Sequence, residues 1–462
     1  MLRLFDTGTG TVHPLAQRDP GRVSMYVCGP TVYDYPHLGH GRFTLVFDVL
    51  RRYLIFSGLD VDYVSNITDI DDHIIERAAA EGRRESAVTE QYEAAWWAAM
   101  DQLGVLRPTS TPHATAYVDD MVALVADLVD RGVAYETADG VYLEVGQVPD
   151  YGLLAGQPLE SLRVGARVET LDDKRAPFDF VLWKKAKPGE PEWPSPWGPG
   201  RPGWHTECVV MSLDLLGEGF DLHGGGQDLR FPHHENERAQ AEALGRAFAQ
   251  HWVHNGWVVV EGEKMSKSLG NFTTLTDLLA RHDSRAYRLL VLQAHYRSPI
   301  EVTASTVAQA EESLQRLDSL ARRFALADTL ADGPVVAGRG PGADLDGEAR
   351  AAFTAFMDDD LDTPQAMALI FELVRRANAA ADAGSEAEGR RLATTVAGLC
   401  GALGLAVRAE TAAVDPETAR LATERDAARS ARDWARADAI RDELTAAGWI
   451  VEDGPGGTVV RR

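Results

Sequence analysis

Cysteine is scarce in this sequence, and no stretch of it is both long and apolar. Only Cys28, Cys208 and Cys400 occur among 462 residues, an odd number spread far apart. Such a set excludes a disulfide framework and favours a reducing compartment, so we expect a cytoplasmic protein. No window approaches the roughly 18 consecutive apolar residues of a spanning helix, and the first residues lack the apolar core of a signal peptide. We therefore expect no membrane partner.

Positive charge is also in short supply. The chain has 46 lysine and arginine residues against 70 aspartate and glutamate residues, a formal net charge of −24. Most of such a surface repels phosphate, which excludes a general nucleic-acid coat, although a local basic face can still bind RNA. With 462 residues, 45% of them hydrophobic, the chain is too long for one core, and we expect two to four domains.

Strands and helices alternate in the first part of the chain. Apolar runs at 23–29 and 61–68 predict buried strands, and apolar residues at helical spacing between 44 and 56 predict a helix that stops before Gly58. This order is typical of a parallel sheet with crossover helices. Nucleotides bind such sheets at the carboxyl ends of their strands, so the fold is predicted to be an α/β nucleotide-binding domain.

The remaining segments differ from the first part, and from one another, in their predicted secondary structure and in their content of glycine and proline. Between 115 and 200, strands at 141–145 and 179–185 are separated by loops rich in proline and glycine, which predicts an insertion between two halves of the sheet. From 282 the pattern is all-helical, interrupted by a flexible tether at 331–348. The predicted segments are a first catalytic half at 1–114, a connective insertion at 115–200, a second catalytic half at 201–255, a loop region at 256–305, a helical bundle at 306–405 and a C-terminal region at 406–462.

A pair of histidines lies at the start of the first predicted helix. Residues 37–40 read HLGH, so the two imidazoles are three residues apart. At a helix N-terminus both can face an anion, and Gly39 leaves room for a ribose or a purine on the backbone. Four residues alone are more often a glycine turn flanked by surface histidines.

A pair of lysines follows the strand predicted at 257–261. Lys264 and Lys267 lie three residues apart in the string KMSKS. Such a loop can close over a triphosphate and stabilise charge as pyrophosphate leaves. It could equally be a solvated basic turn, but the two strings in this order, at opposite ends of one sheet domain, are much more specific than either alone.

Together the two strings resemble the signatures of class I aminoacyl-tRNA synthetases. The resemblance implies a Rossmann-like catalytic domain that uses ATP, with magnesium, to activate an amino-acid carboxylate. It implies ATP binding by His37, Gly39, His40 and Lys267. It also makes His37, His40, Lys264 and Lys267 the implied catalytic residues, the histidines on the phosphates and the lysines on the departing pyrophosphate.

Four residues far apart in sequence could bind a metal. Two thiolates (Cys28, Cys208), one imidazole (His233) and one carboxylate (Glu237) make a reasonable tetrahedral zinc set. If 233–237 is helical, positions four apart project from one face. The spacing matches no knuckle motif, and a lone cysteine is more often a small buried hydrophobe.

Several strings resemble those of cysteinyl-tRNA synthetases, and the resemblance runs over essentially the whole chain. They are VCGPTVYD at 27–34, NITD at 66–69, PGWH at 202–205, DLHGGG at 221–226, HHENE at 233–237 and the tail RADAIRDELTAAGWIVED at 436–453. The resemblance implies a class I synthetase-type parallel-sheet catalytic domain with an inserted connective segment, followed by an all-helical C-terminal region. In that family 256–305 would contain the KMSKS loop and contact the tRNA stem, and 406–462 would bind the anticodon.

The resemblance also implies the reaction and its site. Cysteine would be activated to cysteinyl-adenylate and passed to the 3′-terminal ribose of tRNA(Cys). One zinc ion per chain would be held by Cys28, Cys208, His233 and Glu237, with His234 as an alternative ligand. Zinc favours a thiolate over the hydroxyl of serine, so no editing domain is needed. Candidates for holding the amino and carboxylate groups are Gly29, Thr68, Trp204, His223 and Asp228, of which Asp228 suits an ammonium.

The C-terminal region offers a basic stripe. Arg425, Arg429, Arg432 and Arg436 fall at spacings of four, three and four, which would place four guanidiniums on one helix face as a tRNA-binding surface. They could equally form a solvated face paired with Asp426, Asp433 and Asp438. We expect the chain to act as a monomer.

The main alternative is a ligase that activates cysteine identically but transfers it to an amino-sugar amine, as in mycothiol synthesis. Its active-site strings would be similar, but a small acceptor requires no C-terminal arm. A non-catalytic zinc- or RNA-binding relative should lack His37, His40, Lys264 or Lys267, and all four are present.

Overall fold

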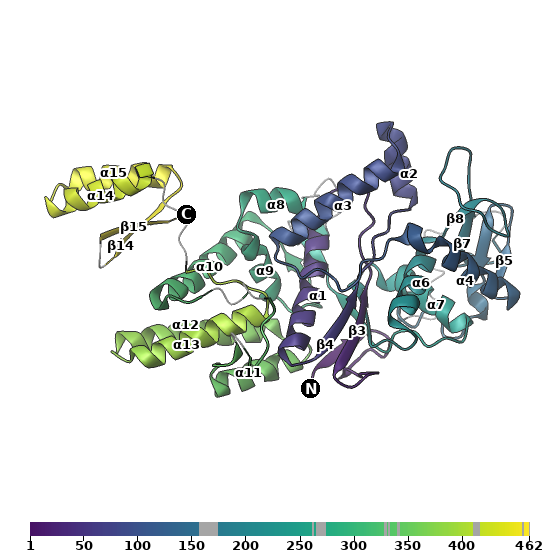
Figure 1. Cartoon of the computed structure of the whole chain (residues 1–462), viewed down its shortest axis with the longest axis horizontal. Helices are drawn as coiled ribbons and strands as arrows, with labels where there is room; N and C mark the ends of the chain where they lie inside the picture. Colours follow the sequence, from purple (N-terminus) through teal and green to yellow (C-terminus); the bar gives the residue numbers. More distant parts are fainter. Residues whose placement is uncertain are drawn as a thin grey trace.

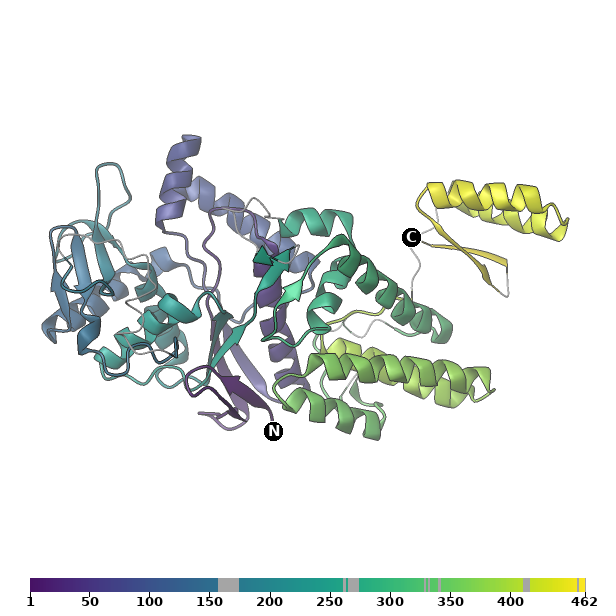
Figure 2. The same ribbon diagram turned by 180° about the vertical axis from the view of Figure 1, so that it is seen from behind.

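The chain is described here from a computed structural model. The structure describes residues 1–156, 174–260, 263–264, 274–327, 330, 333–339, 342–409, 416–454 and 457–461. Figures 1 and 2 show a central sheet with the insertion on one side and a helical bundle on the other. No helix among the described residues combines the length and the apolar character needed to cross a bilayer.

The central sheet has four parallel strands in the order β10-β9-β3-β4. They are β3 (Arg22–Val27), β4 (Asp60–Val64), β9 (Leu222–Gly226) and β10 (Trp252–Asn255). The helix α1 (Leu38–Phe56) connects β3 to β4, and α6 (Trp204–Leu216) precedes β9. This arrangement confirms the predicted parallel sheet, whose two halves come from segments more than 150 residues apart in the sequence.

Alternating residues of β3 serve two different cores. Val23, Met25 and Val27 lie in the same hydrophobic cluster as the apolar face of α1. Tyr26 and Cys28, on the other face of the strand, belong to the cluster that includes α6 and the insertion. The period-two pattern of the strand therefore directs Cys28 toward the helix that bears Cys208.

The insertion forms a separate antiparallel sheet. Its order is β5-β6-β7-β8, with β5 (Ala134–Glu136), β6 (Gly140–Leu143), β7 (Phe180–Lys185) and β8 (Gly200–Pro202). The helix α4 (Val118–Asp130) packs on it. The strands expected at 141–145 and 179–185 are thus present as β6 and β7. Trp183, fully buried, fills the centre of this unit.

The remaining helices flank the sheet and form the bundle. Those near the sheet are α2 (Asp72–Glu81), α3 (Glu85–Gln102), α7 (Glu235–Ala243), α8 (Leu275–Arg281) and α9 (Ser284–Leu292). The bundle contains α10 (Ala304–Phe324), α11 (Gly347–Asp358), α12 (Thr363–Asp382) and α13 (Glu386–Ala402). Short strands β11 (Val258–Val260), β12 (Glu263–Lys264) and β13 (Ile300–Glu301) form a three-stranded sheet, and β1 (Arg3–Asp6) pairs with β2 (Thr11–Pro14).

A buried ion-pair network joins α1 to the bundle. Asp48 accepts hydrogen bonds from Arg52 at 2.8 Å and from Arg288 of α9 at 2.6 Å, and all three are nearly inaccessible to solvent. Arg288 also donates to the carbonyl of Leu403, at the end of α13. A buried carboxylate with two guanidiniums is costly to disrupt, so this network fixes the bundle relative to the central sheet.

The segment predicted as a flexible tether packs against the protein where it is described. Val335 is 1% exposed, and the backbone N–H of Ala337 donates to the carbonyl of Phe56 at the end of α1. The segment predicted as a flexible tether at 331–348 therefore contacts the rest of the protein at these described residues, and a turn closed by the Val336–Arg339 bridge lies within it.

The C-terminal unit has a small core of its own and stands apart from the bundle in both views (Figures 1 and 2). It contains α14 (Pro416–Ser430), α15 (Trp434–Ala446) and the antiparallel hairpin β14 (Ile450–Gly454) and β15 (Gly457–Arg461). The region after the sheet is helical as predicted, except for this hairpin, which corrects the expectation of an all-helical end. Trp449 and Val460 are buried in the core of this unit, so the hairpin packs against α14 and α15.

Candidate functional site

Four side chains of the types that bind metals meet near the carboxyl end of β3. Cys28 directly follows β3, and Cys208 lies on α6. His233 lies in the helical turn Arg230–His234 that leads into α7, and Glu237 lies within α7. All four are buried, and their ligand atoms lie within 4.8 Å of one another. The two sulfurs are 3.6 Å apart, Cys208 Sγ is 3.7 Å from His233 Nε2, and Cys28 Sγ is 3.4 Å from Glu237 Oε1. The structure therefore brings together the predicted set.

Two further histidines hold the ligands in place. His205 Nδ1 lies 2.9 Å from Nδ1 of His233, which leaves Nε2 of His233 directed at Cys208. His223 Nε2 lies 2.6 Å from Glu237 Oε2, so that the other carboxylate oxygen faces His233 at 2.9 Å. Such outer contacts fix the orientation of ligands and raise their affinity for metal.

The charges within the cluster are strongly coupled. Burial alone would raise the pKa of Glu237, but His223 and His233 hold it well below its ordinary value. Burial alone would lower the pKa of His233, but Glu237 and Cys208 raise it to about 10. Burial and the neighbouring Cys208 thiol raise the pKa of Cys28 well above its usual range.

His234 forms a second, overlapping group with Cys28, His223 and Glu237. Its Nδ1 is 2.8 Å from His254 Nε2, and its buried Nε2 has no hydrogen-bond partner among the described residues. This alternative contains one thiol, whereas the group with His233 contains two.

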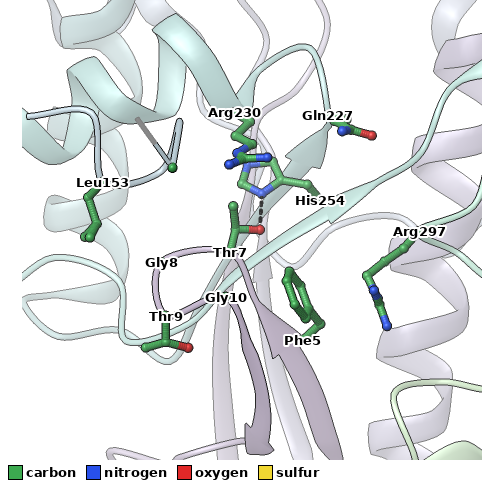
Figure 3. A pocket seen from close by; sticks show the side chains of 11 residues that line it. Phe5, Thr7, Gly8, Thr9, Gly10, Leu153, Gln227, Arg230, His254 and Arg297 are labelled. Carbon is green, nitrogen blue, oxygen red and sulfur yellow. Dashed lines mark hydrogen bonds between the residues drawn. The ribbon is translucent and has the colours of Figure 1, made fainter. Parts of the chain in front are cut away.

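A pocket lined by both polar and apolar residues opens at His254 of the edge strand β10 (Figure 3). His254 lines the pocket, and its Nδ1 is 2.8 Å from the hydroxyl of Thr7, as the dashed line in Figure 3 marks. Arg230 and Arg297 contribute guanidiniums to the wall. A series of hydrogen bonds from Thr7 to His254 and from His254 to His234 therefore connects this pocket with the overlapping group of candidate ligands that contains His234.

The expected amino-acid contacts Gly29 and Thr68 lie next to the cluster. The Gly29 N–H donates to Asn66 Oδ1 at 2.9 Å, and a Cβ at position 29 would lie 1.7 Å from the carbonyl oxygen of Asn66. Only glycine fits at that distance. The Thr68 hydroxyl donates to Glu207 Oε2 at 2.9 Å and accepts from the Asn66 amide at 3.2 Å.

Trp204, His223 and Asp228 occupy different environments. Trp204 is 37% exposed and stacks on the His233 ring, with centroids 4.0 Å apart, so it covers the cluster on the solvent side. His223 is fully buried behind Glu237. Asp228 is exposed on the loop after β9, and its carboxylate lies beside Gly226.

His37 and His40 form a reciprocal cap at the start of α1. The Nδ1 atom of each ring accepts the backbone N–H of the other residue at 3.2 Å, and the rings stack with centroids 3.6 Å apart. Because each Nδ1 accepts, each neutral ring carries its proton on Nε2. The helix start therefore combines two imidazole N–H donors with its own positive end.

The lysine loop is only partly described. β12 ends at Lys264, whose backbone pairs with Val259, whereas Lys267 lies outside the described residues. Directly after the undescribed stretch, Thr274 forms a β-bridge with His37, and the N–H of Leu275 donates to the carbonyl of Pro36. The chain on the far side of the loop therefore returns to the histidine pair.

The four arginines do not form one stripe. Arg425 and Arg429 lie on α14, Arg432 lies in the following turn with a φ of 62°, and Arg436 lies on α15. Arg425 is buried against Asp453 and Thr458, while Arg436 pairs with Glu424. The prediction of a single helical face is wrong, because the chain turns back between the two helices.

Sequence reasoning missed the residues that position the ligands. His205 and Glu207 lie in the string WHTEC that was singled out for Cys208, and Asn66 lies in NITD, so their positions were available but their partners were not. His254 and Thr7 carried no signal, because each acts through a contact across more than 240 residues.

Three family models match consecutive parts of the chain. Residues 14–312 match the tRNA synthetases class I (C) catalytic domain, residues 352–408 the DALR domain, and residues 411–461 the cysteinyl-tRNA ligase anticodon binding domain.

Full-length relatives and solved structures agree with these matches. The chain is 48% identical to the cysteine–tRNA ligase of Alkalilimnicola ehrlichii and 48% identical to that of Thioalkalivibrio sulfidiphilus, with 100% of each chain covered. Methionyl-tRNA synthetase of Mycobacterium tuberculosis, in complex with methionyl-adenylate, aligns with a TM-score of 0.60 at 16% identity, covering 83% of this chain and 89% of that one. At that identity the likeness shows the fold alone.

Proposed function

The chain belongs to the cysteine–tRNA ligase family, and on that premise we propose how its own residues perform the reaction. The carboxylate of cysteine attacks the α-phosphate of ATP, and pyrophosphate leaves as cysteinyl-adenylate forms. A hydroxyl of the 3′-terminal ribose of tRNA(Cys) then attacks the adenylate carbonyl, and AMP leaves. The observation that carries the proposal is the convergence of two thiols, an imidazole and a carboxylate at the same sheet whose first helix begins with the histidine pair.

The geometry of the cluster fits zinc. Tetrahedral zinc with bonds of about 2.3 Å to sulfur and about 2.0 Å to nitrogen places two sulfurs about 3.8 Å apart, and a sulfur and a nitrogen about 3.5 Å apart. The corresponding separations are 3.6 Å between Cys28 and Cys208 and 3.7 Å between Cys208 and His233. We assign the ligands as Cys28, Cys208, His233 and Glu237, and prefer His233 over His234 because its group includes both thiols.

Zinc at this position would favour the thiolate form of a bound cysteine and discriminate against serine. The protein residues orient the rest of the substrate. Gly29 lets the carbonyl oxygen of Asn66 approach next to Cys28, and Thr68 is held against Asn66 and Glu207, so both residues shape the wall beside the candidate ligands. Trp204 limits solvent access above His233, and the exposed Asp228 carboxylate suits the substrate ammonium. Buried His223 acts on the site through Glu237.

The phosphates of ATP and magnesium are assigned to the other end of the site. His37 and His40 direct Nε2 donors to the phosphates, with Gly39 between them at the first turn of α1. Lys264 and Lys267 stabilise the charge on departing pyrophosphate. The proximity of Thr274 to His37 supports the common action of the two strings on one triphosphate.

His205→Ala tests the role of the residue that orients His233. Loss of its contact with His233 Nδ1 is expected to weaken zinc binding by about 10–100-fold, because outer contacts of this kind fix the ring orientation of the ligand. Competition with a chromophoric chelator measures the affinity. His113→Ala, which removes a half-exposed histidine paired with Glu93, is the control and should bind zinc as the unaltered chain does. Equal affinity for all three proteins would contradict the assignment.

The anticodon of tRNA is proposed to bind the C-terminal unit near the turn between α14 and α15. Arg432 is exposed there, beside Trp434, whose side chain is 59% exposed. A cation for phosphate and an aromatic face for stacking are suited to single-stranded RNA. Arg425, Arg429 and Arg436, which pair with acids of the same unit, are assigned a smaller role.

Arg432→Glu is therefore expected to weaken tRNA binding and to reduce the slope of log affinity against log salt by about 1. Cysteine-dependent pyrophosphate exchange without tRNA should stay unchanged, since that chemistry belongs to another domain. The matched control is Arg420→Glu, the same reversal of charge at an exposed arginine on the first half of α14. In the unaltered chain Arg420 donates to Glu417. If both variants bind tRNA like the unaltered chain, the turn is not the RNA contact.

We propose a cytoplasmic monomer with catalytic halves at 1–114 and 201–255, and the location rests on the scarcity of cysteine in the chain. The other proposed domains are the insertion at 115–200, the stem-contact region at 256–305, the bundle at 306–405 and the anticodon-binding region at 406–462.

The amino-sugar alternative is not favoured, because the matches extend through the anticodon-binding part. Product analysis with cysteine, ATP and either a tRNA(Cys) transcript or an amino sugar tests this choice. Cysteinyl-tRNA alone is expected, and transfer to the amino sugar alone would reverse the conclusion.

A further inference from the structure

A second group of metal-binding side chains lies away from the cysteines, where the first hairpin meets the edge strand of the sheet. Asp6 ends β1, His13 lies in β2, and His251 immediately precedes β10. One ligand atom from each lies within 4.8 Å of the others, and the two imidazole centroids are 4.4 Å apart. These residues take no part in the site described above.

The hydrogen bonds of His251 fix the position of its proton. Its Nε2 lies 3.2 Å from the carbonyl oxygen of Leu4, and since a carbonyl only accepts, Nε2 must carry the hydrogen. The Nδ1 atom of the neutral ring is then a bare lone pair. This atom is buried, since His251 is only 1% exposed, and it has no hydrogen-bond partner among the described residues. A buried nitrogen lone pair without a hydrogen-bond donor is available to coordinate a metal ion.

The same reasoning applies to His13. Its Nδ1 donates to the carbonyl oxygen of Pro14 at 3.2 Å, which leaves the lone pair of the neutral ring on Nε2. That atom is 3.6 Å from Asp6 Oδ2, too far for a hydrogen bond. The side chain of His13 is 35% exposed, so an ion and its water ligands could reach the group from this side.

Asp6 completes the group as an oriented anion. Its Oδ1 accepts the Trp252 N–H at 2.8 Å and its Oδ2 accepts the Thr9 N–H at 2.8 Å. Burial alone would raise the pKa of Asp6, but these backbone hydrogen bonds lower it below its ordinary value. Two imidazoles and a carboxylate therefore each offer one ligand atom within 4.8 Å of the others, and a cation between them would neutralise the Asp6 charge.

We propose that Asp6, His13 and His251 bind one divalent transition-metal ion of the zinc class, independently of the cysteine-containing site. Two imidazoles and one carboxylate are ligands that Zn²⁺, Co²⁺ and Ni²⁺ accept, and they leave at least one position for water. The ion joins the β1–β2 hairpin to the beginning of β10, and so acts on the stability of the sheet edge. The competing occupant is a proton on His13, which would make an ion pair with Asp6.

Cobalt titration of the metal-free full chain distinguishes the two occupants. We expect two Co²⁺ ions per chain, of which only one produces the near-ultraviolet charge-transfer absorption of thiolate ligation. His13→Gln should bind one ion and keep that absorption, whereas Cys208→Ser should keep an ion without it. His73→Gln, which alters an exposed histidine 3.7 Å from Glu76, is the matched control and should bind two.

A second readout addresses folding. Excess Zn²⁺ should raise the melting temperature of Cys208→Ser, and the increase should be lost when His13→Gln is added, while far-ultraviolet circular dichroism without metal is the same for both proteins. One ion in the unaltered chain, or two in a folded His13→Gln chain, would overturn the proposal and leave the proton as the occupant.

Discussion

Cys208→Ser is expected to lose its tightly bound, thiolate-ligated zinc and to activate cysteine more than about 100-fold more slowly than the unaltered chain. The reason is that loss of an outer contact alone typically costs 10–100-fold in metal affinity or activity, and this change removes a ligand itself. His233→Ala should behave in the same way, because its Nε2 faces both Cys208 and Glu237. Metal analysis after gel filtration with a weak chelator, together with cysteine-dependent pyrophosphate exchange, measures both effects.

The matched control for this prediction is Cys400→Ala. Cys400 is also fully buried, but it lies on α13 within the hydrophobic core that includes the bundle. Its replacement should lower thermal stability slightly and leave both the zinc content and pyrophosphate exchange unchanged. Full thiolate-ligated zinc in Cys208→Ser and His233→Ala, with normal exchange, would show that the ion, if any, lies elsewhere.

Lys267→Ala and His40→Ala are each expected to slow cysteine activation by about 10²–10³-fold while leaving zinc content and cysteine affinity nearly unchanged. Each removes a donor aimed at charge that develops on the phosphates in the transition state. His40 also caps α1, so part of its effect will appear as a loss of stability of about 1 kcal/mol. Single-turnover formation of the adenylate and equilibrium binding of cysteine separate the catalytic effect from the binding effect.

The double variant tests whether the two residues act on the same triphosphate. If they do, the combined loss in rate should differ from the product of the two separate losses, since groups acting as a unit are not additive. His73→Ala, an exposed histidine stacked on Tyr33, serves as the histidine control and should activate cysteine normally. Normal exchange in Lys267→Ala would remove the role assigned to the lysine loop.

The sheet could be predicted because its signals are local, whereas the four candidate metal ligands were implied by the resemblance to cysteinyl-tRNA synthetases. The apolar run before Cys28 is a strand, and the spacing of His233 and Glu237 places both on one side of a helix, where the structure finds Nε2 of one 2.9 Å from Oε1 of the other. The histidine pair was likewise predictable from its position at a helix start, because Nδ1 of each ring satisfies a backbone N–H that the helix leaves unpaired.

Features that depend on long-range contacts could not be predicted from local patterns. The arginines from 425 to 436 have helical spacing, but α14 ends at Ser430 and Arg432 adopts a positive φ, so the periodicity continues across a turn. The role of His205 depends on a contact with His233 across 28 residues, and that of His223 on a contact with Glu237 across 14. The Asp6, His13 and His251 group depends on pairing of the first hairpin with a strand more than 230 residues later.

The most direct test of the central claim is the ratio of kcat/KM for cysteine to that for serine in amino-acid-dependent pyrophosphate exchange by the full chain. Shape alone separates near-isosteric substrates by only about 10²-fold, whereas a site with a specific polar or metal contact to the distinguishing group reaches about 10⁴–10⁵-fold. The account predicts a preference for cysteine above about 10⁴-fold, lost together with zinc in Cys208→Ser. A zinc-loaded chain that prefers cysteine by only about 10²-fold or less would contradict it.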